Sequence, residues 1–172
     1  MDFIHRYDSP LGGITLASDG AALTGLWFDG QRYFASALNR TYSEADLPVF
    51  DEACRWLDCY FSGKAPDFTP KLAPCGTAFH RAVWEILLTV PYGKTVTYGE
   101  IAGRVTEAAR IPRMSARAVG GAVGRNPISL IIPCHRVIGA GGRLTGYAGG
   151  TDRKAKLLAL ENPAGSCRNL IK

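Results

Sequence analysis

The chain has 172 residues, of which 47% are hydrophobic and 20% charged, and no apolar run approaches the roughly 20 residues of a membrane-spanning helix. This composition is typical of a globular protein with one ordinary domain or two small ones. The net charge of +5 is uneven, because residues 1–75 hold six Lys or Arg and ten Asp or Glu, whereas residues 76–172 hold fourteen and five. The basic second half is therefore expected to face a polyanion.

The cysteines and histidines do not form a recognisable metal or disulfide pattern. The five cysteines are an odd number without framework spacing, and the three histidines are widely scattered, so we expect no metal site. The first residues lack the apolar stretch of a signal peptide, which leads us to expect an intracellular protein, cytoplasmic or, in a eukaryote, nuclear. The cysteines are Cys54, Cys59, Cys75, Cys134 and Cys167.

The first half begins with three short apolar segments, residues 3–7, 14–18 and 23–28, separated by turn sequences rich in Gly, Asp and Ser. This pattern predicts an antiparallel meander. Residues 30–47 give no clear pattern, and part of that segment is open to a helical interpretation.

A helix is predicted from Pro48 to about Ser62, because proline suits the first helical position and an apolar stripe follows it. Cys54 and Cys59 lie on this helix and are interpreted as packing residues. The next segment, 63–76, contains three prolines and two glycines and reads as a linker. We therefore predict two domains, residues 1–75 with the linker and residues 76–172.

The second half predicts a pair of short helices joined by a turn. Thr77 can cap a first helix, and Thr97 with Glu100 forms a capping-box sequence that opens a second. After a break near Pro112, Ser115 can cap a third helix, residues 116–124. The last two helices have the spacing of a helix-turn-helix.

The helix over residues 116–124 contains three glycines, Gly120, Gly121 and Gly124. Each glycine weakens a helix by up to about 1 kcal/mol relative to alanine, so close approach by another backbone is the expected benefit. That backbone is either a neighbouring helix or a nucleic acid, and Arg117 on the same helix favours nucleic acid.

The central stretch, residues 126–139, places a thiol, an imidazole and a guanidinium between apolar residues. Cys134 could be a small buried hydrophobe, as many free cysteines are. Alternatively, His135 and Arg136 lower its pKa and make it a nucleophile. On an extended segment adjacent side chains point to opposite faces, so cooperation of Cys134 with His135 requires a water relay or a turn after Pro133.

The C-terminal part contains two glycine-rich segments, residues 139–142 and 146–150, which predict a short hairpin and a loop closing over a site. Thr151 is the expected cap of a last helix ending at Glu161, and Pro163 forbids its continuation.

The motif Pro133-Cys134-His135-Arg136-Val137, led by Asn126-Pro127, resembles the active-site motif of the O6-alkylguanine-DNA alkyltransferases. Residues 117–120, Arg-Ala-Val-Gly, and 146–150, Gly-Tyr-Ala-Gly-Gly, extend the resemblance, which covers roughly residues 76–161. It implies an α/β (α+β) fold with a ribonuclease-H-like N-terminal α/β domain of antiparallel strands and a C-terminal winged helix-turn-helix domain.

The resemblance also implies an activity. The family repairs DNA by direct, stoichiometric and irreversible transfer of an alkyl group from O6-alkylguanine, and in some cases O4-alkylthymine, to its own cysteine. The implied partner is double-stranded DNA bearing the lesion, bound by a monomer without cofactor or membrane.

Family roles can be carried over to matching positions. Cys134 would be the acceptor, His135 would take its proton through a water, and Glu161 would orient the histidine. Asn126 would bridge the helix-turn-helix to the cysteine, and Tyr98 would donate a hydrogen bond to the base. Arg117 would fill the vacated base stack; the other expected DNA contacts are Tyr98, Ser115, Ala118, Arg125 and Arg136. The expected alkyl pocket is Pro133, Val137, Tyr147 and Ala148.

Two other classes remain as alternatives. Alkyltransferase-like proteins bind such lesions without transfer but carry another residue in place of the cysteine, so Cys134 argues against them. A winged-helix regulator would not need the cysteine motif. The sequence departs from many members of the family in one respect, because its helix-turn-helix connection is about five residues longer.

Overall fold

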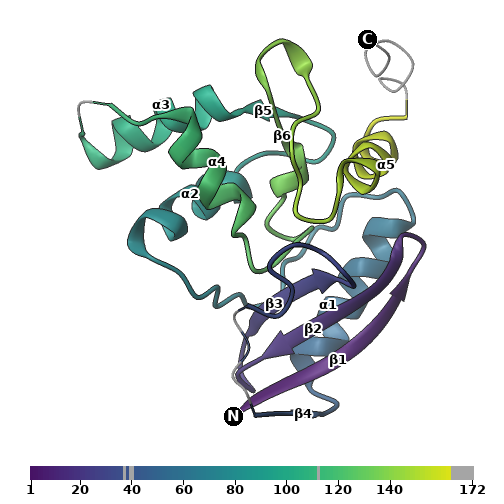
Figure 1. Ribbon diagram of the computed structural model, residues 1–172. Coiled ribbons are helices and arrows are strands. Elements are labelled where there is room, and N and C mark those ends of the chain that lie inside the picture. Colours follow the sequence, from purple (N-terminus) through teal and green to yellow (C-terminus); the bar gives the residue numbers. More distant parts are fainter. Residues whose placement is uncertain (37, 39–40, 112, 164–172) are drawn as a thin grey trace. The chain divides into compact units, whose positions relative to one another are not determined.

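The computed structural model describes the chain except for residues 37, 39–40, 112 and 164–172 (Figure 1). The chain divides into two compact units. The first consists of Met1–Cys75 together with Pro127–Ile131, and the second of Gly76–Asn126 and the chain from Ile132 onward. The return of residues 127–131 to the first unit differs from the single division after residue 75 that the sequence predicts.

The first unit contains a four-stranded sheet in the order β3-β2-β1-β4. Its strands are β1 (Asp2–Ser9), β2 (Gly12–Ser18), β3 (Leu23–Phe28) and β4 (Tyr42–Glu44). The antiparallel pairs β1–β2 and β2–β3 confirm the predicted meander. The sequence missed β4, which pairs parallel with β1, and the described part of residues 30–47 contains no helix.

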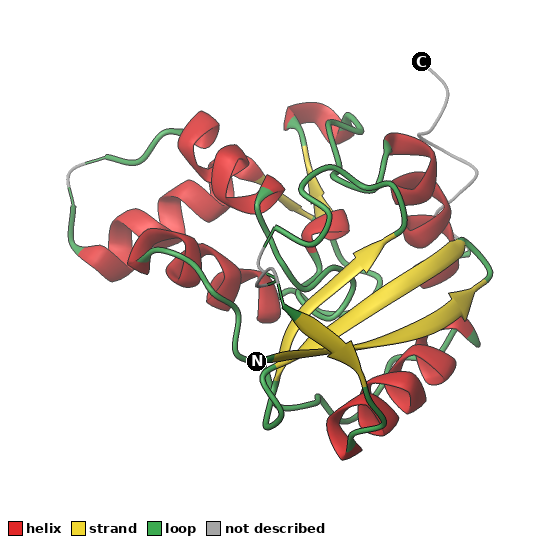
Figure 2. Ribbon diagram, turned by 60° about the horizontal axis from the view of Figure 1, so that its bottom comes forward, coloured by secondary structure: helices red, strands yellow, loops and turns green. Residues whose placement is uncertain are grey.

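Helix α1 (Pro48–Phe61) crosses one face of this sheet (Figure 2). The predicted apolar stripe is the buried side of the helix, with Trp56, Leu57 and Tyr60 at 6% exposure or less. Cys54 lies half-buried on α1, where burial and the nearby Asp58 and Asp51 raise its thiol pKa to about 11. Such a thiol is a poor nucleophile, which agrees with the interpretation of Cys54 as a packing residue.

Two segments from elsewhere in the chain pair with the outer edge of β3. The amide of Leu23 donates to the carbonyl of Lys71 at 2.8 Å, and the amide of Leu26 donates to the carbonyl of Pro127 at 2.9 Å. The amide of Ser129 donates to the carbonyl of Leu26 at 2.9 Å. These bonds satisfy a strand edge that would otherwise be open to pairing with another chain.

The segment 127–131 is also fixed by unusual backbone geometry. Ser129 donates its hydroxyl to the side-chain oxygen of the buried Gln31 at 3.3 Å. Leu130 has φ of 68°, and the Ile131 amide donates to the Ser129 carbonyl at 2.9 Å. A γ-turn of this sign is rare for a bulky residue and costs free energy, so the surrounding packing must hold it.

The second unit is mainly helical. Its helices are α2 (Ala78–Leu88), α3 (Tyr98–Ala109), α4 (Ala116–Gly124) and α5 (Thr151–Glu161). Thr77, Thr97 and Ser115 cap α2, α3 and α4 as predicted, and the Thr97–Glu100 capping box is complete. The prediction for Thr151 was wrong: it is the first helical residue, and the N-cap is Gly150, with φ of 91° and no side-chain bond.

The helices of the second unit are joined by specific contacts. Trp84 of α2 is 2% exposed and donates its indole N–H to the Ala122 carbonyl of α4 at 2.9 Å. Strands β5 (Val96–Thr97) and β6 (Val137–Ile138) form a small parallel pair. After β6 the chain turns at Ala140–Gly142, where Gly141 and Gly142 have φ of 70° and 79°, and the Gly139 amide donates to the Arg143 carbonyl across the turn at 2.8 Å. None of the described helices has the length and apolar character needed to cross a membrane.

Candidate active site

The chain turns sharply at Pro133, which places Cys134 at the start of a 3₁₀ helix, Cys134–Arg136. Pro133 has φ of −81° and ψ of 64°, and the Cys134 amide donates to the Ile132 carbonyl at 2.8 Å. The turn after Pro133, one of the two arrangements by which Cys134 could cooperate with His135, is therefore present. The side chains of Cys134, His135 and Arg136 spread around this turn instead of alternating between two faces, and all three are buried.

The thiol of Cys134 lies beside the amide of Asn126. Asn126 donates from Nδ2 to the Ile132 carbonyl at 2.7 Å and to Cys134 Sγ at 3.1 Å. Its own backbone amide donates to the Val123 carbonyl, so it follows directly from the end of α4. Asn126 thus connects the helix pair to the cysteine within the second unit.

Burial has the largest effect on Cys134 and raises its thiol pKa. The bond from Asn126, the charge of Lys154 and the backbone amides of Cys134 and His135 act in the opposite direction. The lowering of this pKa that the sequence suggested for neighbouring cations is therefore outweighed by burial of the thiol. We therefore expect Cys134 to rest as a thiol at neutral pH and to need a base.

His135 and Glu161 form a fully buried pair, with His135 Nε2 2.6 Å from Glu161 Oε1. Burial opposes ionisation of Glu161, but the hydrogen bonds and charges of His135 and Arg136 outweigh it and lower the pKa of Glu161 to about 2. Because the carboxylate can only accept, Nε2 is the donor, and the lone pair of the neutral ring lies on Nδ1. Burial, partly offset by Glu161, keeps the pKa of His135 below its usual value, so the ring is neutral and can accept a proton.

Arg136 also contacts Glu161, which the sequence did not predict. Its Nε donates to Oε2 at 2.9 Å, a terminal nitrogen donates to Oε1 at 3.1 Å, and the other donates to the Val90 carbonyl at 2.6 Å. Arg136 is 8% exposed. This geometry disagrees with the predicted DNA contact, because the guanidinium is directed inward and its donors are used inside the unit.

Two further residues of the site gave no sequence signal. Lys154 on α5 is fully buried and donates from Nζ to the Val137 carbonyl at 2.5 Å and the Thr145 carbonyl at 2.9 Å. Burial lowers its pKa to about 8, and Cys134 is its electrostatic partner. The amide of Gly93 donates to Glu161 Oε2 at 3.0 Å. In the sequence both residues resemble ordinary helix and turn residues.

Among the residues expected to hold the base and the alkyl group, Tyr98 contacts the segment 145–148, to which Tyr147 and Ala148 belong. Tyr98 is the first residue of α3, and its hydroxyl lies 3.5 Å from the Gly146 carbonyl and accepts from the Thr145 hydroxyl at 3.3 Å. The Tyr147 ring packs edge-on against His135, with 6.5 Å between the centroids. Pro133 and Val137 are buried beside Cys134 in sequence, and Ala148 is half-buried.

The exposed side of α4 carries the remaining predicted DNA contacts, Ser115, Arg117, Ala118 and, at its end, Arg125. A Cβ atom on Gly121 or Gly124 would meet no described atom within 4 Å, and one on Gly120 would lie 3.7 Å from Tyr98. Among the described residues, a neighbouring helix therefore does not explain Gly121 and Gly124, and the approach of a nucleic-acid backbone stays a prediction.

The other described thiols, Cys54, Cys59 and Cys75, belong to the first unit. Cys59 is half-buried on α1 and Cys75 is exposed, both in the first unit, and Cys167 lies outside the described residues. Within the described ranges, no three His, Cys, Asp or Glu side chains form a group that could hold a metal ion.

A buried thiol with an imidazole–carboxylate pair, in the same unit as a helix pair with an arginine-bearing exposed face, defines a protein that acts on nucleic acid through a cysteine. Comparison with known families identifies which one. The model for the DNA-binding domain of 6-O-methylguanine DNA methyltransferase matches residues 78–163, and the model for the ribonuclease-like domain of the same proteins matches residues 3–74. The chain belongs to the 6-O-methylguanine DNA methyltransferase family, which confirms the resemblance.

Individual relatives agree with this assignment. The methylated-DNA–protein-cysteine methyltransferase of Mycobacterium tuberculosis is 48% identical over 154 residues, 90% of this chain and 88% of that protein. The protein of the same name from Methanosarcina acetivorans is 47% identical over 162 residues, which are 94% of this chain and 97% of that protein. The crystal structure of M. tuberculosis OGT in complex with DNA aligns with a TM-score of 0.80 at 43% identity over 94% of this chain and 93% of the other. The predicted mixed α/β fold, with an N-terminal sheet domain and a C-terminal helical domain, is thereby confirmed.

Proposed function

We propose that this protein repairs DNA by moving an alkyl group from O6 of guanine to Sγ of Cys134. A carbon–sulfur bond forms as the carbon–oxygen bond breaks, the thiol proton passes to His135, and the electron pair of the broken bond goes to the guanine. The guanine anion then takes up one proton, which balances the one that the thiol gave up, and neutral guanine remains in the DNA. Transfer from DNA to a protein cysteine is the family's activity. The observation that carries the assignment to Cys134 is the buried thiol held by Asn126, followed directly by the His135–Glu161 pair.

The proposed proton path uses the geometry of this pair. An alkyl carbon on oxygen is a poor electrophile, so Cys134 must attack as a thiolate. Because Nε2 of His135 donates to Glu161, Nδ1 is the ring nitrogen that accepts the thiol proton of Cys134. A water between them would carry the proton. Glu161 then stabilises the imidazolium that forms, and Lys154 favours the thiolate electrostatically.

The base must leave the helix to reach a buried thiol. We assign Arg117, exposed near the start of α4, to the space that the guanine vacates. Tyr98 would donate its hydroxyl to the flipped base and so neutralise charge as guanine departs. Pro133, Val137, Tyr147 and Ala148 would surround the alkyl group, which could also come from O4 of thymine.

The remaining parts of the proposal concern partners and location. The protein would act as a monomer on double-stranded DNA, with no cofactor, since the thiol itself accepts the group. It would work in the compartment that holds the chromosome, the cytoplasm or, in a eukaryote, the nucleus.

The test is substitution of the acceptor. Cys134→Ser should abolish transfer while leaving binding to the lesion, because a hydroxyl is a far weaker nucleophile at neutral pH. The protein is incubated with a duplex holding one O6-methylguanine, its intact mass is measured, and the methyl group is mapped by peptide analysis. Cys75→Ser, which changes an exposed thiol, is the matched control and should transfer normally. Methyl transfer that persists in Cys134→Ser, or maps to another cysteine, would refute the assignment.

A further inference from the structure

Thr145 lies on the segment between β6 and α5, and its side-chain hydroxyl donates to the hydroxyl oxygen of Tyr98 at 3.3 Å. The Tyr98 hydroxyl is directed in turn at the Gly146 carbonyl, 3.5 Å away. A phenol has one proton and two lone pairs, so a bond accepted from Thr145 leaves the Tyr98 proton for a different acceptor. At 3.5 Å the carbonyl holds that proton only weakly, which keeps it available to a ligand.

The small parallel sheet of the second unit brings Tyr98 and Thr145 together. Tyr98 directly follows β5, which pairs with β6. Gly139 directly follows β6, and its amide donates to the Arg143 carbonyl at 2.8 Å, which closes the turn that leads to Thr145. The two hydroxyls belong to residues 47 positions apart in the chain, so the tertiary fold creates their contact.

Both the side chain and the backbone of Thr145 are held in place. Gly139 is buried and has φ of −74°, a value open to any residue, yet a Cβ atom there would lie 2.9 Å from the Thr145 methyl carbon Cγ2. The absence of a side chain at Gly139 thus makes room for that methyl group. Because Cγ2 and Oγ1 share one χ1 angle, a fixed methyl also fixes the hydroxyl beside Tyr98. The Thr145 carbonyl accepts from Nζ of the buried Lys154 at 2.9 Å.

This contact acquires a role during the proposed reaction. When the carbon–oxygen bond breaks, its electron pair goes to the guanine, and a hydrogen bond from Tyr98 would stabilise the charge that develops there. That bond draws negative charge onto the Tyr98 oxygen. A second donor to the same oxygen strengthens the first bond, because hydrogen bonds in a chain polarise one another. The hydroxyl of Thr145 is placed to be that second donor.

We propose that Thr145 is a positioning residue for alkyl transfer, which holds the oxygen of Tyr98 and strengthens its hydrogen bond to the departing guanine. The inference rests on the proposed function, because it needs Tyr98 to face the flipped base. Thr145 touches neither the base nor the alkyl group in this role, and no proton leaves it. It should therefore affect the rate of transfer and not the affinity for DNA.

Thr145→Val tests the inference, since valine keeps the branched shape and loses the hydroxyl. Single-turnover methyl transfer from a duplex holding one O6-methylguanine should slow roughly threefold to tenfold, the effect of one hydrogen bond. Thr145→Ser keeps the hydroxyl and should recover most of the native rate. Both variants should bind an unmodified duplex with native affinity.

A double-mutant cycle with Tyr98→Phe separates a role through Tyr98 from a general effect on the segment that carries Thr145. Tyr98→Phe removes the oxygen that accepts from Thr145. Adding Thr145→Val to it should therefore cause no further loss of rate. A residue that only supports the segment would instead slow transfer by the same factor in both backgrounds.

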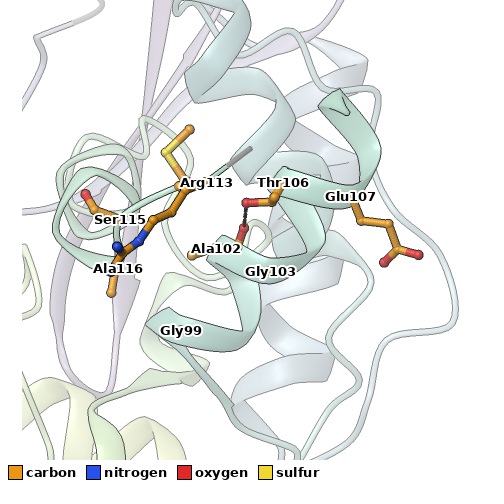
Figure 3. Close-up of a pocket in the computed structure, with 9 residues that line it drawn as sticks. Gly99, Ala102, Gly103, Thr106, Glu107, Arg113, Ser115 and Ala116 are labelled. Atoms are coloured by element: carbon orange, nitrogen blue, oxygen red, sulfur yellow. Dashed lines mark hydrogen bonds between the residues drawn. The ribbon is translucent and has the colours of Figure 1, made fainter. Parts of the chain in front are cut away.

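Thr106→Val is the matched control. Thr106 lies on α3, as Tyr98 does, and borders an open groove, where its hydroxyl donates to the Ala102 carbonyl at 2.8 Å (Figure 3). The chemical change is the same and it also removes a hydroxyl hydrogen bond, but that bond lies within the helix. Transfer by Thr106→Val should proceed at the native rate.

The outcomes separate this inference from the proposed function. If the native protein accepts a methyl group and Thr145→Val reacts at the same rate, the contact has no part in transfer. Thr145→Ser reacting as slowly as Thr145→Val would exclude the hydroxyl, and an equal loss in the Tyr98→Phe background would exclude action through Tyr98. Failure of the native protein to accept a methyl group would instead overturn the proposed function, and this inference with it.

Discussion

Glu161 accepts hydrogen bonds from His135, from Arg136 and from the amide of Gly93, so one buried carboxylate joins three segments of the second unit. Arg136 is the feature that permits this arrangement. A buried carboxylate facing only a neutral imidazole would tend to take up a proton, whereas a guanidinium keeps it charged. The ionised Glu161 in turn fixes the ring nitrogen of His135 that remains as the base.

The ionisation of Glu161 predicts an acid-sensitive fold. Its pKa is about 2 in the folded protein and about 4.3 in an unfolded chain, so its stabilising effect is complete above pH 4.3 and is lost as the pH falls through 2. This difference corresponds to about 3 kcal/mol. Urea unfolding at a series of pH values should show that loss in the native protein and a flatter profile in Glu161→Gln.

One control and one further measurement complete this experiment. Glu107→Gln removes an exposed carboxylate and should keep the native pH profile. At pH 7, Glu161→Gln should itself unfold more easily by about 3–5 kcal/mol, because it leaves Arg136 buried without its charged partner. An unchanged profile in Glu161→Gln would mean that other groups cause the acid sensitivity.

Lys154 provides a second prediction for single residues. Lys154→Met removes the cation that favours the Cys134 thiolate, so the pKa of the thiol should rise and alkylation at neutral pH should slow. The rate of methyl transfer is measured against pH, and the rising limb of the profile should move to higher pH. Lys156→Met, an exposed lysine on the same helix, is the control. A profile that falls at all pH values without moving would indicate a purely structural role.

A site residue could be predicted from the sequence only where a recognisable motif contains it, and not where the tertiary fold alone brings it to the site. The contact between His135 and Glu161 could be expected because the resemblance of the Pro133–Val137 motif to a known family implied it. Lys154 could not, because in the sequence it is one of three basic residues in four positions, a pattern typical of a solvated helix face. Only the tertiary fold turns it inward. The same applies to Arg136, whose inward direction is set by Glu161, 25 residues away.

Helices and strands also differ in whether local sequence or distant contacts determine them. The caps at Thr97 and Ser115 bond to amides three residues later, so local sequence determines them. Strand β4 is three residues long and exists through its pairing with β1, about forty residues earlier, which no local pattern reports. Thr151 failed as a cap because Gly150 adopts φ of 91°, a conformation that moves the helix start by one residue.

Helix α4 carries a prediction about base extrusion. Arg117→Ala should slow repair of a lesion in duplex DNA more than transfer from a free alkylated guanine base, because only the duplex requires a base to be flipped. Single-turnover rates on the two substrates are compared. Arg125→Ala, at the exposed end of the helix, serves as a charge-matched comparison and should show a smaller difference between them. Equal losses on both substrates would remove Arg117 from this role.

The whole molecule should react once and then become less stable. The described residues around Cys134 hold no group placed to cleave a thioether, so titration with a methylated duplex should end at one equivalent. Cys134 is 4% exposed, and added volume in a packed site costs about 1–3 kcal/mol. At about 2–4 °C per kcal/mol, the alkylated protein should melt several degrees lower. Repair beyond one equivalent would refute the stoichiometric reaction, whereas an unchanged melting temperature would refute only the packing argument.

The placement of Pro127–Ile131 in the first unit affects the order in which the chain can fold during its synthesis. When residue 75 has left the ribosome, the backbone of Leu26 in β3 still lacks its hydrogen-bond partners Pro127 and Ser129. The side chain of Gln31 likewise lacks the hydroxyl of Ser129. The sheet can be completed only after about fifty further residues have been made, by which time α2, α3 and α4 are already available. The last five residues of the first unit therefore arrive immediately before Cys134 emerges, so a nascent chain cannot present its reactive thiol until the segment that completes the sheet has been synthesised.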